Sequence, residues 1–230
     1  MNENQAAVVE AVMRRRKTEK VLCHDIDSRQ SVPIALAEKY NPLVRDAIKA
    51  AGWAPFHYPR SADGIVEPWR AHVLWDEKLQ AAAQFMRDSL PDAKSEAALI
   101  AGCHALVLVT WLPGYYRVDE QGLPAQPASR QKEINIDEEH LAAASAMVQN
   151  LLLMLTAHEM GNYWSSGGKL RERTMFDYFG IPNNERLLAA VFIEYPELPD
   201  ACKQRKPGKL RDSRSLDWIR EIEALPATLP

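Results

Sequence analysis

Cysteine is scarce in this sequence, and its three copies lie far apart. Cys23, Cys103 and Cys202 form no C-x-x-C pair, and their odd number argues against a disulfide framework. None of the six histidines has the spacing of H-E-x-x-H or another ligand motif. We therefore expect reduced thiols in the cytoplasm and no bound metal ion.

A surplus of positive charge is also missing. Lys and Arg number 28 against 31 Asp and Glu, which gives a formal net charge of −3. Proteins that bind nucleic acid usually carry a basic patch or stripe, because their affinity comes largely from contacts to phosphate. The charge balance argues against a nucleic-acid binder and leaves only local clusters of positive charge to explain.

Several common catalytic motifs are absent. The chain has no G-x-S-x-G elbow, no Walker loop and no G-x-G-x-x-G after a strand. These absences argue against the common hydrolases, P-loop enzymes and dinucleotide folds. They suit a protein in which a bound cofactor carries the chemistry and the polypeptide supplies binding, orientation and electrostatics.

Long apolar runs are limited to one segment, Leu141–Met160. It approaches the length of a membrane span, but Gln149 and Asn150 lie at its centre and His158 lies near its end. A helix buried in a protein core explains this pattern better than a membrane span does. The polar start of the chain, MNENQ, does not resemble a secretory signal, so we expect a cytoplasmic protein that contacts no membrane.

Helical and strand-like segments alternate along the 230 residues, 47% of which are hydrophobic. The predicted helices are residues 4–16, 76–89 and 94–101, and the predicted strands are residues 69–75, 104–111 and 189–195. No repeat or linker divides the chain. We therefore expect a single domain, residues 1–230, of the α+β class, with a mixed central sheet flanked by helices.

Two further helices are delimited by residues typical of helix ends. Asn41 as the N-cap, Pro42 at the first helical position and Gly52 past the end predict a helix between them. The acidic run 137–139 predicts the start of a long buried helix that stops at Gly161. Its small residues, AAASA, would let a neighbouring backbone approach closely.

Positive charge is concentrated where the first predicted helix ends. Arg14, Arg15, Arg16, Lys17 and Lys20 lie within seven residues. Two interpretations stay open on these residues alone. The cations complement the negative end of the helix dipole, or they hold an anion.

Three later segments are candidates for ligand contact. The sequence GNYWSSGGK, residues 161–169, has small residues that expose N–H groups and hydroxyls, although an ordinary polar turn has the same composition. The segment 203–206 is a second basic group, which by itself also suits solvated surface. The irregular segment 112–135 is a lid or a surface insertion, and its Tyr115 and Tyr116 are candidates for substrate contact.

Taken in order, these segments resemble the nitroreductase family of FMN-dependent oxidoreductases, which form intertwined homodimers with flavin at the subunit interface. Residues Arg16, Lys17, Thr18, Lys20 and Leu22 follow the family's R-x-S-x-R/K-x-F motif with conservative changes. The central long helix resembles A-x-Q-N-L-L-L-A-A, and KQRKP resembles the closing K-x-R-x-P. The resemblance implies a nitroreductase-like fold with the long helix at a homodimer interface.

The resemblance also implies roles for single residues. Arg16 would contact the FMN phosphate with Lys17 and Thr18 nearby, while Lys20 would lie at the pyrimidine edge of the flavin. A register that uses Arg14 and Arg15 instead stays open. The remaining implied cofactor contacts are Lys203 and Arg205 to the phosphate, Trp164, Ser165, Ser166 and Gly167 along the flavin, and Pro55, Phe56 and His57 from the other subunit.

Two departures from the family pattern affect the expected pocket, because Phe56 replaces a serine and Glu67 replaces a glutamine.

The implied activity is reduction of FMN by NADH or NADPH, followed by electron transfer to a small acceptor such as a nitroaromatic or a quinone. Lys20 would stabilise the negative charge of reduced flavin. Two alternatives stay open: a non-redox FMN-binding or regulatory protein of the same fold, and a structural dimer with basic patches.

Overall fold

The computed structural model describes residues 3–60, 64–114, 130–197, 203–209, 215 and 217–222. Its helices are α1 (Glu3–Arg15), α2 (Ile34–Ala51), α3 (Asp76–Ser89), α4 (Lys94–Gly102), α5 (Arg130–Ala157) and α6 (Arg173–Phe179), with 3-10 turns at Ile26–Ser28 and Gly168–Arg171. The strands are β1 (Glu19–Leu22), β2 (Trp69–Trp75), β3 (Ala105–Trp111), β4 (Gly161–Ser165), β5 (Arg186–Glu194) and β6 (Gln204–Pro207).

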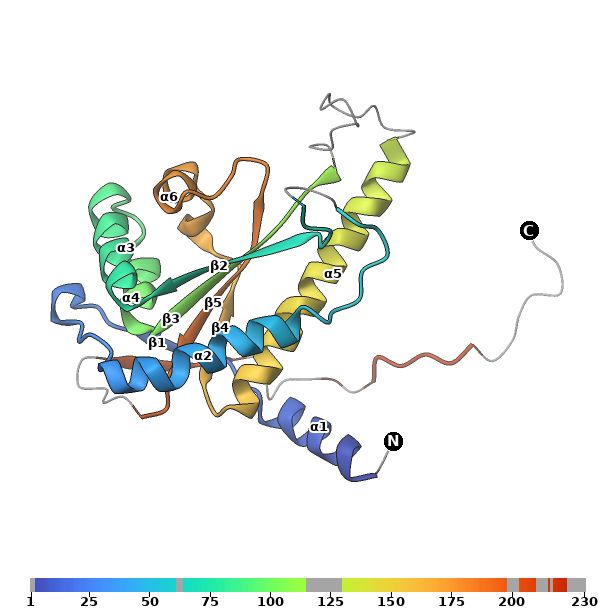
Figure 1. The fold of residues 1–230 in the computed structure, drawn as a ribbon, viewed down its shortest axis with the longest axis horizontal. Coiled ribbons are helices and arrows are strands. Elements are labelled where there is room, and N and C mark those ends of the chain that lie inside the picture. The colour runs from blue at the N-terminus through green and yellow to red at the C-terminus, as the bar shows by residue number, and fades with distance from the viewer. Residues whose placement is uncertain are drawn as a thin grey trace.

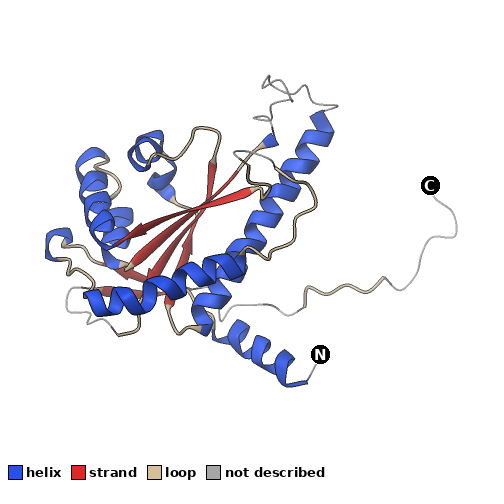
Figure 2. Cartoon of the chain, viewed as in Figure 1, coloured by secondary structure: helices blue, strands red, loops and turns tan. Residues whose placement is uncertain are grey.

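Helices surround a four-stranded sheet with the order β2-β3-β5-β4, and β1 pairs separately with β6 (Figure 1, Figure 2). The α+β class is confirmed, but the expectation of a mixed sheet is wrong, because every pairing among the described strands is antiparallel. A helical connection between strands suggests a crossover to a parallel neighbour. Here α3 and α4 instead return the chain to the end of β2, so that Ala105 pairs with Trp75.

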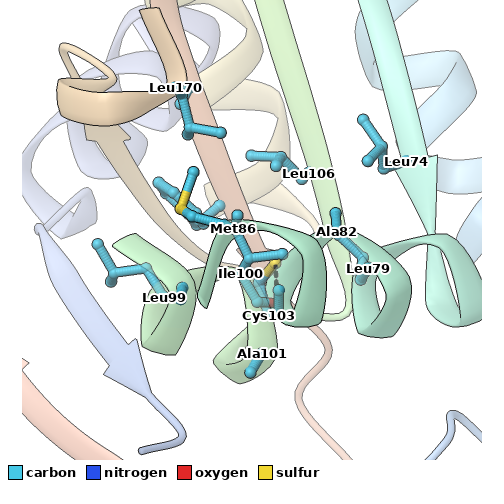
Figure 3. Close-up of a cluster of buried hydrophobic side chains, with 14 of the residues drawn as sticks. Leu74, Leu79, Ala82, Met86, Leu99, Ile100, Ala101, Cys103, Leu106 and Leu170 are labelled. Carbon is cyan, nitrogen blue, oxygen red and sulfur yellow. Dashed lines mark hydrogen bonds between the residues drawn. The ribbon is translucent and has the colours of Figure 1, made fainter. Parts of the chain in front are cut away.

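The sheet is covered on both faces, as the unbroken apolar run of β3 indicates. Successive side chains of a strand point to opposite faces. Leu106 and Leu108 therefore join the cluster formed by α3, α4 and the Gly168–Arg171 turn, whereas Val107 and Val109 join the cluster formed by α2 and α5. Figure 3 shows the first cluster, in which the labelled side chains of α3 and α4 gather against the sheet.

The predicted start of α2 is wrong. The helix begins at Ile34 after Pro33, and Pro42 lies inside it at the loss of one backbone hydrogen bond. The apolar residues before Pro42 continue the helical face, since Tyr40 is buried with Val44 in the core. Asn41 does not cap the helix, because its Oδ1 accepts a hydrogen bond of 2.5 Å from Tyr195 Oη. The end before Gly52 is confirmed.

The long helix α5 is displaced toward the N-terminus relative to its prediction. It begins at Arg130 and ends at Ala157, so the acidic run 137–139 lies two turns inside it. Asp137 instead accepts a hydrogen bond from the backbone N–H of Gly114. The chain reverses at Glu159, which has a positive φ of 62°, and Gly161 already belongs to β4.

The apolar character of α5 belongs to the protein core. By length and composition residues 131–157 could cross a membrane, but half of its most apolar window is buried inside the protein. Met147, Val148 and Leu151 are among its fully buried residues. Such burial is typical of the central helix of a protein that buries a large core.

Strand β1 is attached to the body of the protein through α4. The backbone N–H of Cys23 donates to the carbonyl of Ala98 at 2.9 Å. A Cβ atom at Gly102 would lie 2.3 Å from the carbonyl oxygen of Val21, so only glycine allows this approach. The contact matters because β1 follows directly from the basic segment 14–17.

We expect Gly102→Ala to lower the free energy of unfolding by about 2 kcal/mol, because backbone atoms cannot move aside as a flexible side chain can. Urea unfolding followed by tryptophan fluorescence measures the change. The control is Gly180→Asn, where φ is 68° and a Cβ would meet no atom within 4 Å, so that a residue tolerant of this φ changes stability little. Equal stability of Gly102→Ala and the natural chain would show that α4 does not hold β1.

Candidate functional site

The two basic groups from opposite ends of the chain are brought together by β1 and β6. In this antiparallel pair Lys20 lies opposite Lys206 and Val21 lies opposite Arg205. Gly208 extends the pairing, since its N–H donates to the carbonyl of Thr18 at 2.9 Å. The fold therefore brings the two groups side by side, although Arg16 and Arg205 line different cavities.

Alternate residues after α1 face two different cavities. Arg16 and Thr18 line a shallow cavity of about 340 Å³, together with Gln149, Leu152, Trp164 and Ser166. We call it the Arg16 cavity; no acidic residue is among those that line it. Arg15 and Lys17 line a second cavity of similar volume with Glu19, Glu159, Glu194 and Arg205, which we call the Arg15 cavity.

The alternative register with Arg14 and Arg15 does not lead to the Arg16 cavity. Arg14 forms an exposed pair with Glu10 one helical turn earlier, at 2.6 Å. Arg15 donates to the carbonyl of Thr156 at 2.7 Å and lies 3.9 Å from Glu159. Neither residue is among those that line the Arg16 cavity, and Arg15 lines the Arg15 cavity instead.

The segment GNYWSSGGK forms a strand followed by a tight turn, and not a simple polar turn. Trp164 and Ser165 belong to β4, which pairs with β5. The chain then turns at Gly167, where φ is 103° and a Cβ atom would lie 2.4 Å from Leu187 Cδ2. The N–H of Gly167 donates to Ser165 Oγ at 3.1 Å, and Ser166 is left lining the Arg16 cavity.

Helix α5 supplies Gln149 to the same cavity, a residue that the sequence patterns did not single out for the site. Its position in the sequence could have indicated this role. A side-chain amide in the middle of an apolar helix needs a polar partner, or it must lie at a cavity or at the solvent. In the structure Gln149 is exposed and Leu152 beside it is buried. The cavity therefore combines one guanidinium, two hydroxyls, one amide and one indole.

Lys20 lies apart from the residues that line the Arg16 cavity. Its Nζ is 4.9 Å from the ring centroid of Tyr163 in β4, close enough for a cation–π contact. The side chain is half-buried. Tyr163 packs with the cluster of α3 and α4 and Trp164 with the cluster of α2 and α5, so this contact holds Lys20 on the face of β4 opposite to Trp164.

Lys203 and Arg205 do not line the Arg16 cavity. Arg205 donates from Nη1 and Nη2 to the carboxylate of Glu194, at 2.5 and 2.6 Å, and from Nη1 to Glu19 at 2.8 Å. Lys203 Nζ lies 2.5 Å from His104 Nε2. Burial opposes ionisation of Glu19, but Lys17 and Arg205 together hold its pKa below the usual value. Phosphate binding by Lys203 and Arg205 stays a prediction.

Pro55, Phe56 and His57 line a third cavity, of about 780 Å³, on the N-terminal half of α5. We call it the Phe56 cavity. The Phe56 ring packs edge-on against Trp69 with centroids 5.6 Å apart. Ala146 is the last α5 residue lining it, and Gln149 is the first lining the Arg16 cavity. Because residues three apart are neighbours on a helix, the two cavities lie next to each other along α5, and they share no lining residue.

The remaining predicted residues lie mostly outside the described part of the chain or away from the cavities. Tyr115 and Tyr116, with most of the predicted 112–135 segment, lie outside the described residues. Of the cysteines, Cys23 and Cys103 are buried and unbridged, whereas Cys202 also lies outside the described part. Within the described ranges, no group of three His, Cys, Asp or Glu residues is arranged to hold a metal ion.

A family model described as the nitroreductase family matches residues 41–193, about two thirds of the chain. The chain belongs to the nitroreductase family. The matched residues cover the sheet, α5 and the Trp164 segment but leave out both basic groups, Arg16–Lys20 and Lys203–Arg205. The family match therefore supports the resemblance for residues 41–193. The assignment of the two basic groups to a site is supported only by the geometry described above.

Three relatives illustrate the similarity. A Bacillus subtilis protein named "Putative NAD(P)H nitroreductase YfhC" is 28% identical over 193 residues, 81% of this chain and 90% of the relative. A nitroreductase-like protein structure from Bacillus cereus matches with a TM-score of 0.55 at 16% identity, over 90% of this chain and 95% of that one. A Desulfovibrio desulfuricans structure in complex with FMN matches with a TM-score of 0.51 at 19% identity, over 83% and 87%.

Buried His104 joins the β6 segment to the sheet, and its environment makes it sensitive to acid. Its Nδ1 accepts a hydrogen bond of 2.8 Å from the backbone N–H of Tyr195. Burial, followed by the charges of Lys203, Arg29 and Arg205, lowers the pKa of His104 to about 3. The folded protein therefore keeps this imidazole neutral at pH values where the unfolded chain binds a proton.

We expect His104 to make the protein less stable as the pH falls below about 6.5, by about 1.4 kcal/mol per pH unit until the pKa of the folded state is reached. In His104→Asn the amide oxygen can still accept from Tyr195, but the titration is lost. Urea unfolding between about pH 6 and pH 4 should show a flatter dependence for this variant. Exposed His24→Asn is the control, and parallel curves for all three proteins would contradict the prediction.

Proposed function

We propose that this protein is an FMN-dependent oxidoreductase of a single nitroreductase-like domain, which uses NADH or NADPH to reduce flavin and passes electrons to a small organic acceptor. The observation that carries the proposal is the Arg16 cavity, in which Arg16, Thr18, Trp164 and Ser166 meet on a nitroreductase-family sheet. The name of the Bacillus subtilis relative and the FMN bound by the Desulfovibrio protein support the same activity.

The residues of the Arg16 cavity fit FMN in chemical type. A phosphate dianion is best held by charge-assisted hydrogen bonds, which the guanidinium of Arg16 and nearby hydroxyls can supply. The amide of Gln149 can pair with a heterocyclic edge, and the indole of Trp164 offers a flat apolar surface. FMN, when bound, supplies the capacity to accept a hydride and release electrons.

The protein then contributes binding, orientation and charge. Arg16 and Thr18 hold the phosphate end, and the β4 residue Trp164 and the adjacent Ser166 position the ring system. By the family motif Lys20 would lie at the pyrimidine edge of the flavin, where a positive charge would stabilise the negative charge that grows during reduction. A nitroaromatic or a quinone is a suitable acceptor, because an open, shallow cavity admits flat electron-poor molecules.

Exposed apolar segments near both ends of the described chain support a homodimer, for which we expect a cytoplasmic location. Val8, Val9 and Met13 of α1 are more than half exposed, as are Trp218 and the other apolar residues of 217–222. Residues 217–222 extend away from the sheet and its helices, and α1 projects from the C-terminal end of α5 (Figure 1). Exposed apolar segments of this kind mark association surfaces. A second copy would cover them and bring its Phe56 cavity to the Arg16 cavity.

A non-redox FMN-binding protein of the same fold is the second candidate. One observation favours it: Arg205 is ion-paired with Glu194 and Glu19 and lies outside the Arg16 cavity. The phosphate would then be held by fewer cations than the sequence motif implies. Phe56 and Glu67, which depart from the family pattern, point the same way.

We expect Arg16→Gln to weaken FMN binding by about 10- to 100-fold, the effect of losing one charge-assisted hydrogen bond to phosphate. Titration of the apoprotein with FMN, followed by flavin fluorescence, measures the dissociation constant. Arg14→Gln is the matched control, because Arg14 is two residues away, exposed and paired with Glu10. Equal weakening by both variants would show that Arg16 does not contact FMN. The effect would then come only from the loss of one positive charge near the site.

We expect Lys20→Met to fold and to retain FMN but to be reduced by NADPH or NADH at least about 10-fold more slowly, because a fixed positive charge is lost. Anaerobic stopped-flow bleaching of the flavin absorbance measures the rate. Bleaching of the natural protein by either nucleotide separates the oxidoreductase from the non-redox candidate. An unchanged rate in Lys20→Met would exclude Lys20 from the reaction.

A further inference from the structure

One face of α5 carries residues of both the Phe56 cavity and the Arg16 cavity. They recur at intervals of three or four along the helix, with Asn135, Glu138, Ala142 and Ala146 in the first cavity and Gln149 and Leu152 in the second. Positions at this spacing are neighbours on a helix surface. From Ala146 to Gln149 the helix rises by about 4.5 Å, at 1.5 Å per residue. A molecule bound in the Arg16 cavity therefore lies next to the Phe56 cavity.

The walls of the Phe56 cavity combine a fixed aromatic ring with small apolar side chains. Phe56 is half-buried, and its ring packs edge-on against the buried Trp69, which restricts its movement. Alanines of α5 line the opposite side, and the volume of about 780 Å³ is in the range of small-molecule sites. An aromatic side chain beside such an opening is suited to contact a flat aromatic ligand.

Negative charge is concentrated on the same walls. Glu138 and Glu139 line the Phe56 cavity, whereas no Lys or Arg of the described chain does. Neither glutamate forms an ion pair with another described residue. The Arg16 cavity has the opposite character, because a guanidinium and no carboxylate lines it. Charge of one sign along a cavity wall raises the local concentration of ligands of the opposite sign.

We propose that the Phe56 cavity receives the electron acceptor and selects flat aromatic acceptors that carry a positive charge over those that carry a negative one. The inference rests on the proposed function, which places FMN in the adjoining Arg16 cavity. Phe56 contacts the ring of the acceptor, and Glu138 and Glu139 attract its charge. The same preference follows if a second copy supplies the cavity, because the lining residues are the same.

The first experiment measures binding without turnover. The FMN-loaded protein is titrated with benzamidine, benzamide and benzoate, which are flat, similar in size and respectively positive, neutral and negative. The change in flavin absorbance reports binding. We expect the dissociation constant to rise in that order and to differ at least about 10-fold between benzamidine and benzoate. Equal affinity for the three probes, or tightest binding of benzoate, would overturn the proposal.

Neutral variants locate the source of this preference. Glu138→Gln combined with Glu139→Gln should reduce the difference between benzamidine and benzoate at least about 3-fold, since two exposed charges each contribute modestly. Glu38→Gln combined with Glu77→Gln is the matched control. It changes the net charge equally, but these exposed glutamates lie on α2 and α3 and do not line the cavity. The same reduction in both double variants, or in neither, would contradict the proposal.

The aromatic wall is tested by Phe56→Leu, which keeps an apolar side chain against Trp69 but removes the flat ring. We expect all three probes to bind about 3- to 10-fold more weakly, with the ratio between benzamidine and benzoate retained. Thermal unfolding followed by circular dichroism establishes that the variant is folded. If folded Phe56→Leu binds the probes as tightly as the natural protein, Phe56 does not contact the acceptor.

The second experiment measures selectivity during turnover, with 4-nitrobenzamidine and 4-nitrobenzoate as acceptors at saturating NADH or NADPH. The two substituents also change how readily the ring accepts electrons, so the ratio of their kcat/KM values is compared between proteins. This ratio should fall at least about 3-fold in the Glu138, Glu139 double variant and stay constant in the control.

The outcomes separate this inference from the proposed function. If both acceptors reoxidise the flavin and their ratio is the same in all three proteins, the proposed function stands and the Phe56 cavity does not select the acceptor. If neither nucleotide bleaches bound FMN, the proposed function itself fails, and the acceptor role of the cavity fails with it.

Discussion

Strand β1, Glu19–Leu22, pairs with Gln204–Pro207 of β6, and the positions of the two basic groups at the ends of the chain depend on this short ladder. The pairing is anchored on one side by α4, whose Gly102 lets the backbone of Val21 approach closely. On the other side Arg205 ties β6 to Glu194 of the main sheet. Two four-residue strands therefore connect the ends of the chain to its core.

Alternation along β1 and the residues before it divides positive charge between two environments. Arg16 and Thr18 face the cavity with Trp164, whereas Arg15 and Lys17 face a cavity rich in carboxylates. The first environment sets a guanidinium beside an opening that no carboxylate lines. In the second environment the cations pair with carboxylates of the protein itself. These pairs hold the pKa of Glu19 below its usual value. The same segment thus contains both a proposed binding group and a structural ion-pair network.

Helix α5 relates the Phe56, Arg16 and Arg15 cavities to one another, because it contributes residues to each of them along its length. Its buried side holds the core against β3 and β5, and its remaining surface carries the alanines of the Phe56 cavity and Gln149 of the Arg16 cavity. Such a helix can be apolar over a membrane-spanning length without lying in a membrane. Its apolar residues serve the core.

The sequence by itself determined the elements whose signals are local, such as β2, α3 and the apolar run of β3, and the order of motifs that placed the chain in its family. It did not reveal β4, because a short strand containing Gly161, Asn162 and Ser165 lacks a strong alternating pattern. It also misplaced the start of α2, since packing of Tyr40 overrides the preference of Pro42 for a first turn. Only the tertiary structure decided which cations line the Arg16 cavity and which pair with Glu19 or Glu194. The physical reason is that a side chain's partners are set by strand register and by helices packed from distant parts of the chain, neither of which a local pattern encodes.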